Sequence, residues 1–129
     1  MSEMNLGIIG GGQLGSLLSV AAKKLNIKTT IYSDDSDAPA QNFSDYFIFG
    51  NYNDKDKILE FVNKVDVITY EFENIPFDTL NEINKLKKVL PKPSVNRLIQ
   101  HRLAEKDFVN KLNIRTTRYV SIERKSDIE

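Results

Sequence analysis

Short apolar segments alternate with amphipathic segments from Leu6 to Leu90. The apolar segments are only a few residues long, and several are rich in β-branched or aromatic side chains, which is typical of buried strands. They predict strands at Leu6–Ile9, Lys28–Tyr32, Tyr46–Phe49, Val65–Tyr70 and, in shorter form, Val89–Leu90.

Between these segments, apolar residues recur at helical spacing and predict amphipathic helices. Asp54 is expected to cap one helix and Pro76 to stand in the first turn of another. The helix after the first strand is expected to face the sheet with Leu14, Leu17, Leu18, Ala21, Ala22 and Leu25.

Strands that alternate with helices predict an α/β fold, a Rossmann-like parallel sheet with right-handed crossovers and helices on both faces. In such sheets ligands bind beyond the carboxyl ends of the strands. Two motifs fall at that edge, the glycine turn Gly10–Gly15 and the acidic segment Tyr70–Asn74. The sequence therefore predicts a binding site there.

The pattern changes after Pro93. Ser94–Gln100 and Arg102–Leu112 are predicted to be helices, and Thr116–Val120 has the character of a strand that no later segment pairs. In the second helix the inward residues are expected to be Leu103, Phe108 and Leu112. We divide the chain into a Rossmann-like domain, residues 1–93, and linker helices with the start of a second domain, residues 94–129.

Composition excludes several classes of protein. The 129 residues include no cysteine, which excludes disulfides, thiolate metal sites and cysteine nucleophiles. The 18 basic and 18 acidic side chains cancel, so neither nucleic acid nor a membrane surface is an expected partner. No apolar stretch approaches the ~20 residues of a spanning helix. We expect a soluble, cytoplasmic protein.

The glycine turn carries the clearest chemical signal. Gly10, Gly12 and Gly15 have the G-x-G-x-x-G spacing between a strand and a helix. Glycines let the backbone approach a ligand, and the helix start directs N–H groups at it, so a phosphate or ribose is expected there. Gln13 adds an amide for a polar ligand. The alternative is a turn that only joins strand to helix.

Dinucleotide binding needs an acidic residue near the end of the second strand to hold the ribose hydroxyls. Asp34 and Asp35 stand at the right distance along the chain, so an NAD-binding module is an open hypothesis. Equally, Asp34–Asp37 is explained by a solvated turn with capping character.

Glu71 and Glu73 follow the fourth predicted strand. A carboxylate there could hold an amine-bearing ligand or act as a base. The alternative is a capping and solvated pair. Arg102 and Lys106 share a helical face and could point at a phosphate, although such cations are more often salt-bridged, here with Glu105. His101, the single histidine, fits a surface position and no metal cluster.

Together these motifs resemble a known family. The segments Gly7–Gly15, Asp37–Ala40, Asp66–Pro76 and Gln100–Lys106 occur in an order that resembles the N-terminal part of the N5-carboxyaminoimidazole ribonucleotide synthases. These are purine-biosynthesis enzymes of the ATP-grasp superfamily, in which this part is called the pre-ATP-grasp domain. The resemblance runs from about Leu6 to Val120.

The resemblance implies a ligase that converts 5-aminoimidazole ribonucleotide, bicarbonate and ATP into the N5-carboxyamino product, ADP and phosphate. It implies that Gly12, Gln13 and Leu14 line the ribonucleotide site, with Glu71 beside it and Glu73 a second candidate. Arg102 would reach the ATP phosphates. ATP and Mg would act in the full-length enzyme, with no catalytic residue and no metal ligand in this part. A homodimer is a further expectation.

Two positions depart from the family pattern: Ser16 stands where many members carry arginine, and His101 where aspartate is usual. The ATP-grasp body would follow Val120, so we expect an N-terminal fragment that is inactive alone. The competing hypotheses are the NAD-binding regulatory module and an interaction domain whose glycines are only structural.

Overall fold

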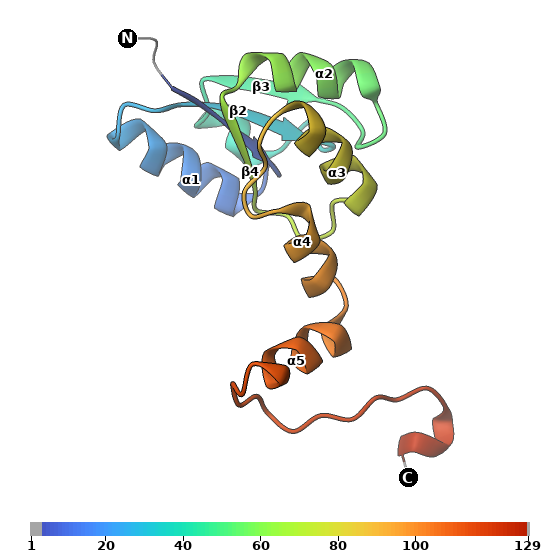
Figure 1. The fold of residues 1–129 in the computed structure, drawn as a ribbon. Coiled ribbons are helices and arrows are strands. Elements are labelled where there is room, and N and C mark those ends of the chain that lie inside the picture. The colour runs from blue at the N-terminus through green and yellow to red at the C-terminus, as the bar shows by residue number, and fades with distance from the viewer. Residues whose placement is uncertain (1–3, 129) are drawn as a thin grey trace.

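A parallel sheet forms the centre of the structure, a computed structural model that describes residues 4–128. Its four strands lie in the order β3-β2-β1-β4 (Figure 1). The outermost residues of the two predicted domains, 1–3 and 129, lie outside the described residues. The strands are β1 (Asn5–Ile9), β2 (Lys28–Ser33), β3 (Tyr46–Phe49) and β4 (Val67–Tyr70).

The register of the sheet places the carboxyl ends of the central strands side by side. Ile9 of β1 pairs with Tyr32 of β2 and with Tyr70 of β4. The residues that follow, including Gly10 and Glu71, therefore leave the sheet at the same edge. The predicted α/β class, its parallel strands and the meeting of the two motifs at this edge are confirmed.

The predicted strand at Val89–Leu90 is reduced to an isolated bridge between Val89 and Ile68. Leu90 donates its N–H to the Ile68 carbonyl at 2.8 Å, and then Pro91 follows. Because proline has no N–H, the ladder cannot extend past this point.

Helices cover both faces of the sheet. One face carries α1 (Gln13–Lys24) and the short 3-10 helix η1 (Pro39–Asn42), and the other carries α2 (Lys55–Lys64) and α3 (Phe77–Leu86). Asp54 caps α2 by accepting the Lys57 N–H, as the sequence predicts. The larger core lies under α2 and α3 and includes Phe61, Val62, Leu80 and Ile83.

The predicted inner face of α1 is wrong. Leu14, Leu17 and Leu25 are 57%, 59% and 70% exposed, and Leu18 and Ala21 are exposed as well. Of the predicted set only Ala22 is buried. The buried side of α1 consists of small residues, Gly15, Ser16, Ser19 and Ala22. Small side chains let the helix lie close to the sheet and η1, which leucines would prevent.

The C-terminal segment extends away from the sheet as an arm (Figure 1). It contains α4 (Pro93–Ile99), which contacts α3, then α5 (Arg102–Lys111) and a 3-10 helix, η2 (Lys125–Ile128). The predicted inward face of α5 is wrong, because α5 has no buried residue, and Phe108 and Leu112 are 45% and 55% exposed. Thr116–Val120 forms no strand, since it lies beside no other strand of residues 4–128. No helix within those residues has the length and apolar character needed to cross a membrane.

Candidate functional site at the carboxyl edge of the sheet

The backbone of the glycine turn lies in close contact with the carboxylate of Glu71. Gly10 has φ +114°, a conformation that favours glycine. A Cβ at Gly10 would lie 2.6 Å from Oε1 of Glu71, so the missing side chain leaves room for that carboxylate. A Cβ at Gly15 would lie 2.6 Å from the Gly10 carbonyl oxygen. The first turn of α1 therefore rests directly on the glycine turn.

Glu71 reaches this turn from the neighbouring strand. Its backbone N–H donates to the Ile9 carbonyl at 3.1 Å, which extends the pairing of β4 with β1 by one residue. Its half-buried side chain accepts the Gly12 N–H at Oε1, 3.2 Å away. The carboxylate thus takes the position at the N-terminus of α1 where the helix dipole favours an anion. The structure brings together Gly12 and Glu71, two of the predicted site residues.

Gln13 and Leu14 begin α1 beside the turn, and both are exposed. Ser16, the first departure from the family pattern, is 8% exposed, and its hydroxyl donates to the Gly12 carbonyl at 3.1 Å. An arginine side chain could not be buried here without a charged partner. The buried serine therefore joins the first turn of α1 to the glycine turn, a role that sequence reasoning missed.

The aspartates after β2 divide into two environments. Asp35 accepts the Asp37 N–H at 2.9 Å, which is the local turn contact that the solvated-turn interpretation expects. Asp34 lies near the Tyr52 hydroxyl. Burial raises the pKa of Tyr52, and the nearby charges of Asp34 and Glu71 raise it further. Tyr52 is therefore a neutral donor beside the site. Sequence reasoning missed it, because it lies in a loop without a motif.

Glu73 does not share the position of Glu71. Its side chain is exposed, and its backbone carbonyl accepts a hydrogen bond from Nε2 of Gln100 at 2.7 Å. The same Nε2 donates to the Ile75 carbonyl at 2.8 Å. The loop that carries both glutamates is therefore tied to the end of α4.

Arg102 lies on the arm rather than at the glycine turn. It begins α5, is 80% exposed, and contacts Glu105 at 2.7 Å, the salt bridge that the sequence suggested as the ordinary alternative. Lys106 lies over the Tyr119 ring, 5.6 Å from its centre. His101 is exposed and caps α5, accepting the Ala104 N–H at Nδ1.

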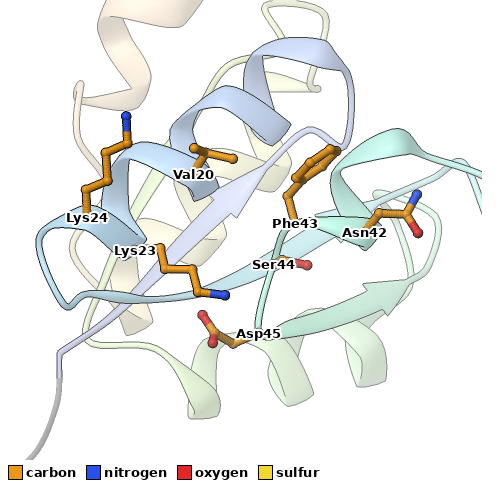
Figure 2. Close-up of a pocket in the computed structure, with 7 residues that line it drawn as sticks. All are labelled: Val20, Lys23, Lys24, Asn42, Phe43, Ser44 and Asp45. Atoms are coloured by element: carbon orange, nitrogen blue, oxygen red, sulfur yellow. The ribbon is translucent and has the colours of Figure 1, made fainter.

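A hollow of about 390 Å³ opens at the opposite end of α1 from the glycine turn (Figure 2). Lys23 and Lys24, at the end of the helix, line it together with Phe43. Asp45 also lines it, but its carboxylate already accepts the Thr29 N–H at 2.8 Å. This hollow contains none of the predicted site residues. At the carboxyl edge, by contrast, the Glu71 side chain occupies the space that the glycines leave.

Residues 4–128 hold no group of three or more histidine, cysteine, aspartate or glutamate side chains that could bind a metal ion. Within residues 4–128 the acidic side chains at the carboxyl edge therefore do not fit a magnesium site, and Oε1 of Glu71 already accepts the Gly12 N–H.

The chain is similar in sequence to known proteins of purine synthesis. The N5-carboxyaminoimidazole ribonucleotide synthase of Brucella melitensis is 38% identical over 111 residues, which cover 86% of this chain and 31% of that protein. A bifunctional purine synthesis protein of Dictyostelium discoideum is 37% identical over 124 residues, 96% of this chain and 12% of its own length.

The chain is also similar in structure to solved proteins of the same kind. The N5-carboxyaminoimidazole synthetase of Staphylococcus aureus, complexed with ADP, has a TM-score of 0.84 at 30% identity and matches 98% of this chain. The Aspergillus clavatus synthase, in complex with ADP and 5-aminoimidazole ribonucleotide, has a TM-score of 0.78 at 27% identity and matches 90%. The chain spans about a third of these proteins, 35% and 31% of their chains.

The match at the level of protein families covers most of the chain. Residues 3–100 match the ribonucleotide synthetase preATP-grasp domain, a range that includes the glycine turn and both glutamates. The parallel sheet with its helices agrees with the solved structures of these relatives. The chain belongs to the ribonucleotide synthetase preATP-grasp domain family.

Proposed function

We propose that this chain is the ribonucleotide-binding part of an ATP-dependent ligase that carboxylates the exocyclic amine of 5-aminoimidazole ribonucleotide. The observation that carries the proposal is the contact between the Glu71 carboxylate and the Gly12 N–H at the carboxyl edge of the sheet. The Aspergillus relative, whose structure holds 5-aminoimidazole ribonucleotide, supports this choice of ligand.

The geometry favours the sugar or the amine over the phosphate as the group that meets the glycine turn. The Gly12 N–H is already bonded to Glu71, so the strongest anion position at this helix start is filled by the protein itself. A carboxylate accepts hydrogen bonds and repels a phosphate. Ribose hydroxyls and an aromatic amine donate hydrogen bonds. The Glu71 carboxylate and the Gln13 amide oxygen can accept these bonds.

In the proposed reaction, ATP phosphorylates bicarbonate to carboxyphosphate and leaves as ADP. The amine nitrogen of the ribonucleotide then forms a bond to the carboxyl carbon, inorganic phosphate leaves, and the nitrogen loses a proton. Magnesium, when bound with ATP, would neutralise charge on the phosphates. The role of this chain is to hold the ribonucleotide in place for this reaction.

Arg102 is the proposed contact to ATP. Its exposed guanidinium can leave Glu105, because a surface ion pair contributes only about 0–1 kcal/mol. Guanidinium groups bind phosphate oxygens through paired donors. A homodimer and the division at residue 93 stay predictions.

Calorimetric titration of 5-aminoimidazole ribonucleotide into the purified chain tests the proposal. We expect binding that Glu71→Gln weakens about tenfold or more, since a hydrogen bond to a charged group contributes about 1.5–3 kcal/mol. The matched variant Glu73→Gln should have a smaller effect, because Glu73 is exposed and away from the turn. The same titration with NAD is the second arm. NAD binding that Asp34→Ala abolishes, without ribonucleotide binding, would replace this proposal with the dinucleotide hypothesis.

A further inference from the structure

Residues 71–76 form the loop between β4 and α3. Two amide side chains hold this loop, one from within α4 and one from the residue that ends it. Gln100 donates from Nε2 to the carbonyls of Glu73 and Ile75, at 2.7 and 2.8 Å. Asn96, one helical turn earlier, donates from Nδ2 to the Ile75 carbonyl at 3.3 Å. We call these two residues the α4 amide pair.

The α4 amide pair donates hydrogen bonds to backbone carbonyls that lie beyond the end of β4. Ile75 is fully buried, so its carbonyl needs a partner from the protein. Asn96 is also fully buried, and its Oδ1 has no hydrogen-bond partner within the described residues. An unpaired buried oxygen costs stability, so an apolar side chain would suit the core better. What the asparagine adds is the N–H that holds the loop.

The loop is therefore fixed at both ends. At its start, Glu71 donates its N–H to the Ile9 carbonyl, and its carboxylate accepts the Gly12 N–H. At its end, the α4 amide pair holds Glu73 and Ile75. A loop held at one end only would let the Glu71 side chain move away from the turn, because its single contact there is at 3.2 Å.

We propose that Gln100, with Asn96, is a positioning residue for the ribonucleotide site, an inference that rests on the proposed function. It acts through Glu71, by holding the backbone of the loop that presents this carboxylate to Gly12. Because Arg102 follows Gln100 by two residues, the same contacts also fix where α5 begins relative to the glutamate loop. The ribonucleotide side and the proposed ATP side are thereby linked through a single side chain.

A double-mutant cycle tests whether Gln100 acts through Glu71. Gln100→Met removes the donor and keeps a side chain of similar length. Because Gln100 is exposed, the variant is expected to fold. We expect Gln100→Met to weaken ribonucleotide binding about tenfold, from the loss of two hydrogen bonds. In that background, Glu71→Gln should cost much less than it does alone, since coupled residues are not additive. The matched control Gln41→Met, at an exposed position of η1, should bind as the wild type does.

Amide hydrogen exchange of Gly12 gives a second readout that needs no ligand. Loss of the Glu71 contact should speed exchange of the Gly12 N–H severalfold in Gln100→Met and leave it unchanged in Gln41→Met. Additive effects of Gln100→Met and Glu71→Gln on binding, or unchanged Gly12 exchange, would overturn the proposal. If the wild type does not bind the ribonucleotide, the proposed function fails, and Gly12 exchange alone then decides whether Gln100 positions the loop.

Discussion

The two faces of the sheet are built from different kinds of side chain. Under α2 and α3 the core contains large residues such as Phe61, whose ring lies 5.5 Å from that of Tyr32. Under α1 the cluster is small, Ile8, Ile31 and Ala40, and the helix contributes mainly glycine, serine and alanine. One face thus supplies most of the apolar burial, and the other brings a helix close to the backbone.

This difference serves the site. The close approach of α1 places its first turn on the Gly10 carbonyl, so that the Gly12 N–H meets Glu71. A helix held off by large side chains would carry the turn away from β4. The face with few large side chains is therefore the one that positions the binding residues, and the opposite face provides the stability on which this depends.

The largest expected effect comes from the face of α2 and α3. Phe61→Ala should lower the free energy of unfolding by about 3–5 kcal/mol, because a fully buried ring leaves a cavity. Leu17→Ala on α1 removes an exposed leucine and should cost less than about 1 kcal/mol. Urea unfolding of both variants measures the contrast. Equal losses would show that the α1 leucines are packed and that the comparison of the faces is wrong.

A smaller effect is expected at the contact between α1 and the turn. Gly15→Ala should destabilise the chain by about 2 kcal/mol, because its Cβ would overlap the Gly10 carbonyl and push the helix outward. Helix propensity alone favours alanine over glycine by about 1 kcal/mol, so a stabilised variant would contradict the close packing. Gly12→Ala is the matched control. Its Cβ would lie 3.4 Å from Glu71 Oε1, so we expect a smaller loss in thermal unfolding.

The smallest effect concerns pH. Burial, with the charges of Asp54 and Asp34, raises the pKa of Tyr32 from 10.0 to about 12. The folded state therefore holds this proton more tightly than the unfolded state does. The raised pKa of Tyr32 therefore contributes to the free energy of unfolding below pH 10, and this contribution is lost as the pH rises toward 12. At pH 11 the free energy of unfolding should have fallen by about 1 kcal/mol. Unfolding measured from pH 8 to 11 should show a steeper decline for wild type than for Tyr32→Phe. Parallel declines would contradict it.

Much of the fold follows from the sequence, because its strands are short, apolar and well separated. The predicted bounds of Tyr46–Phe49 match β3, and Asp54 caps α2. The inner face of α1 was not predictable in this way, since apolar periodicity identifies an amphipathic helix but assumes that the apolar side faces inward. Here close packing of small residues decides the orientation.

The candidate site could be predicted only in part. The glycine spacing and the acidic segment identify Gly12 and Glu71, because parallel strands bring their ends together. Tyr52 lies in no motif, and Gln100 begins a segment of the family resemblance that assigned it no role. The roles of both depend on tertiary contacts that no local pattern encodes. Helical spacing identified Arg102 as a possible phosphate contact, and the family resemblance assigned it to ATP. Its location on the arm leaves that contact as a proposal.

We propose that the glycine turn and Glu71 together bind a ribonucleotide. The most direct test is a titration of isotope-labelled chain with 5-aminoimidazole ribonucleotide, followed through backbone amide signals in nuclear magnetic resonance spectra. We expect the largest shifts at Gly12, Gln13, Leu14 and Glu71, and small changes at Lys23 and Lys24 in the hollow at the other end of α1. Saturating shifts centred on that hollow, or no shifts at millimolar ligand, would contradict it.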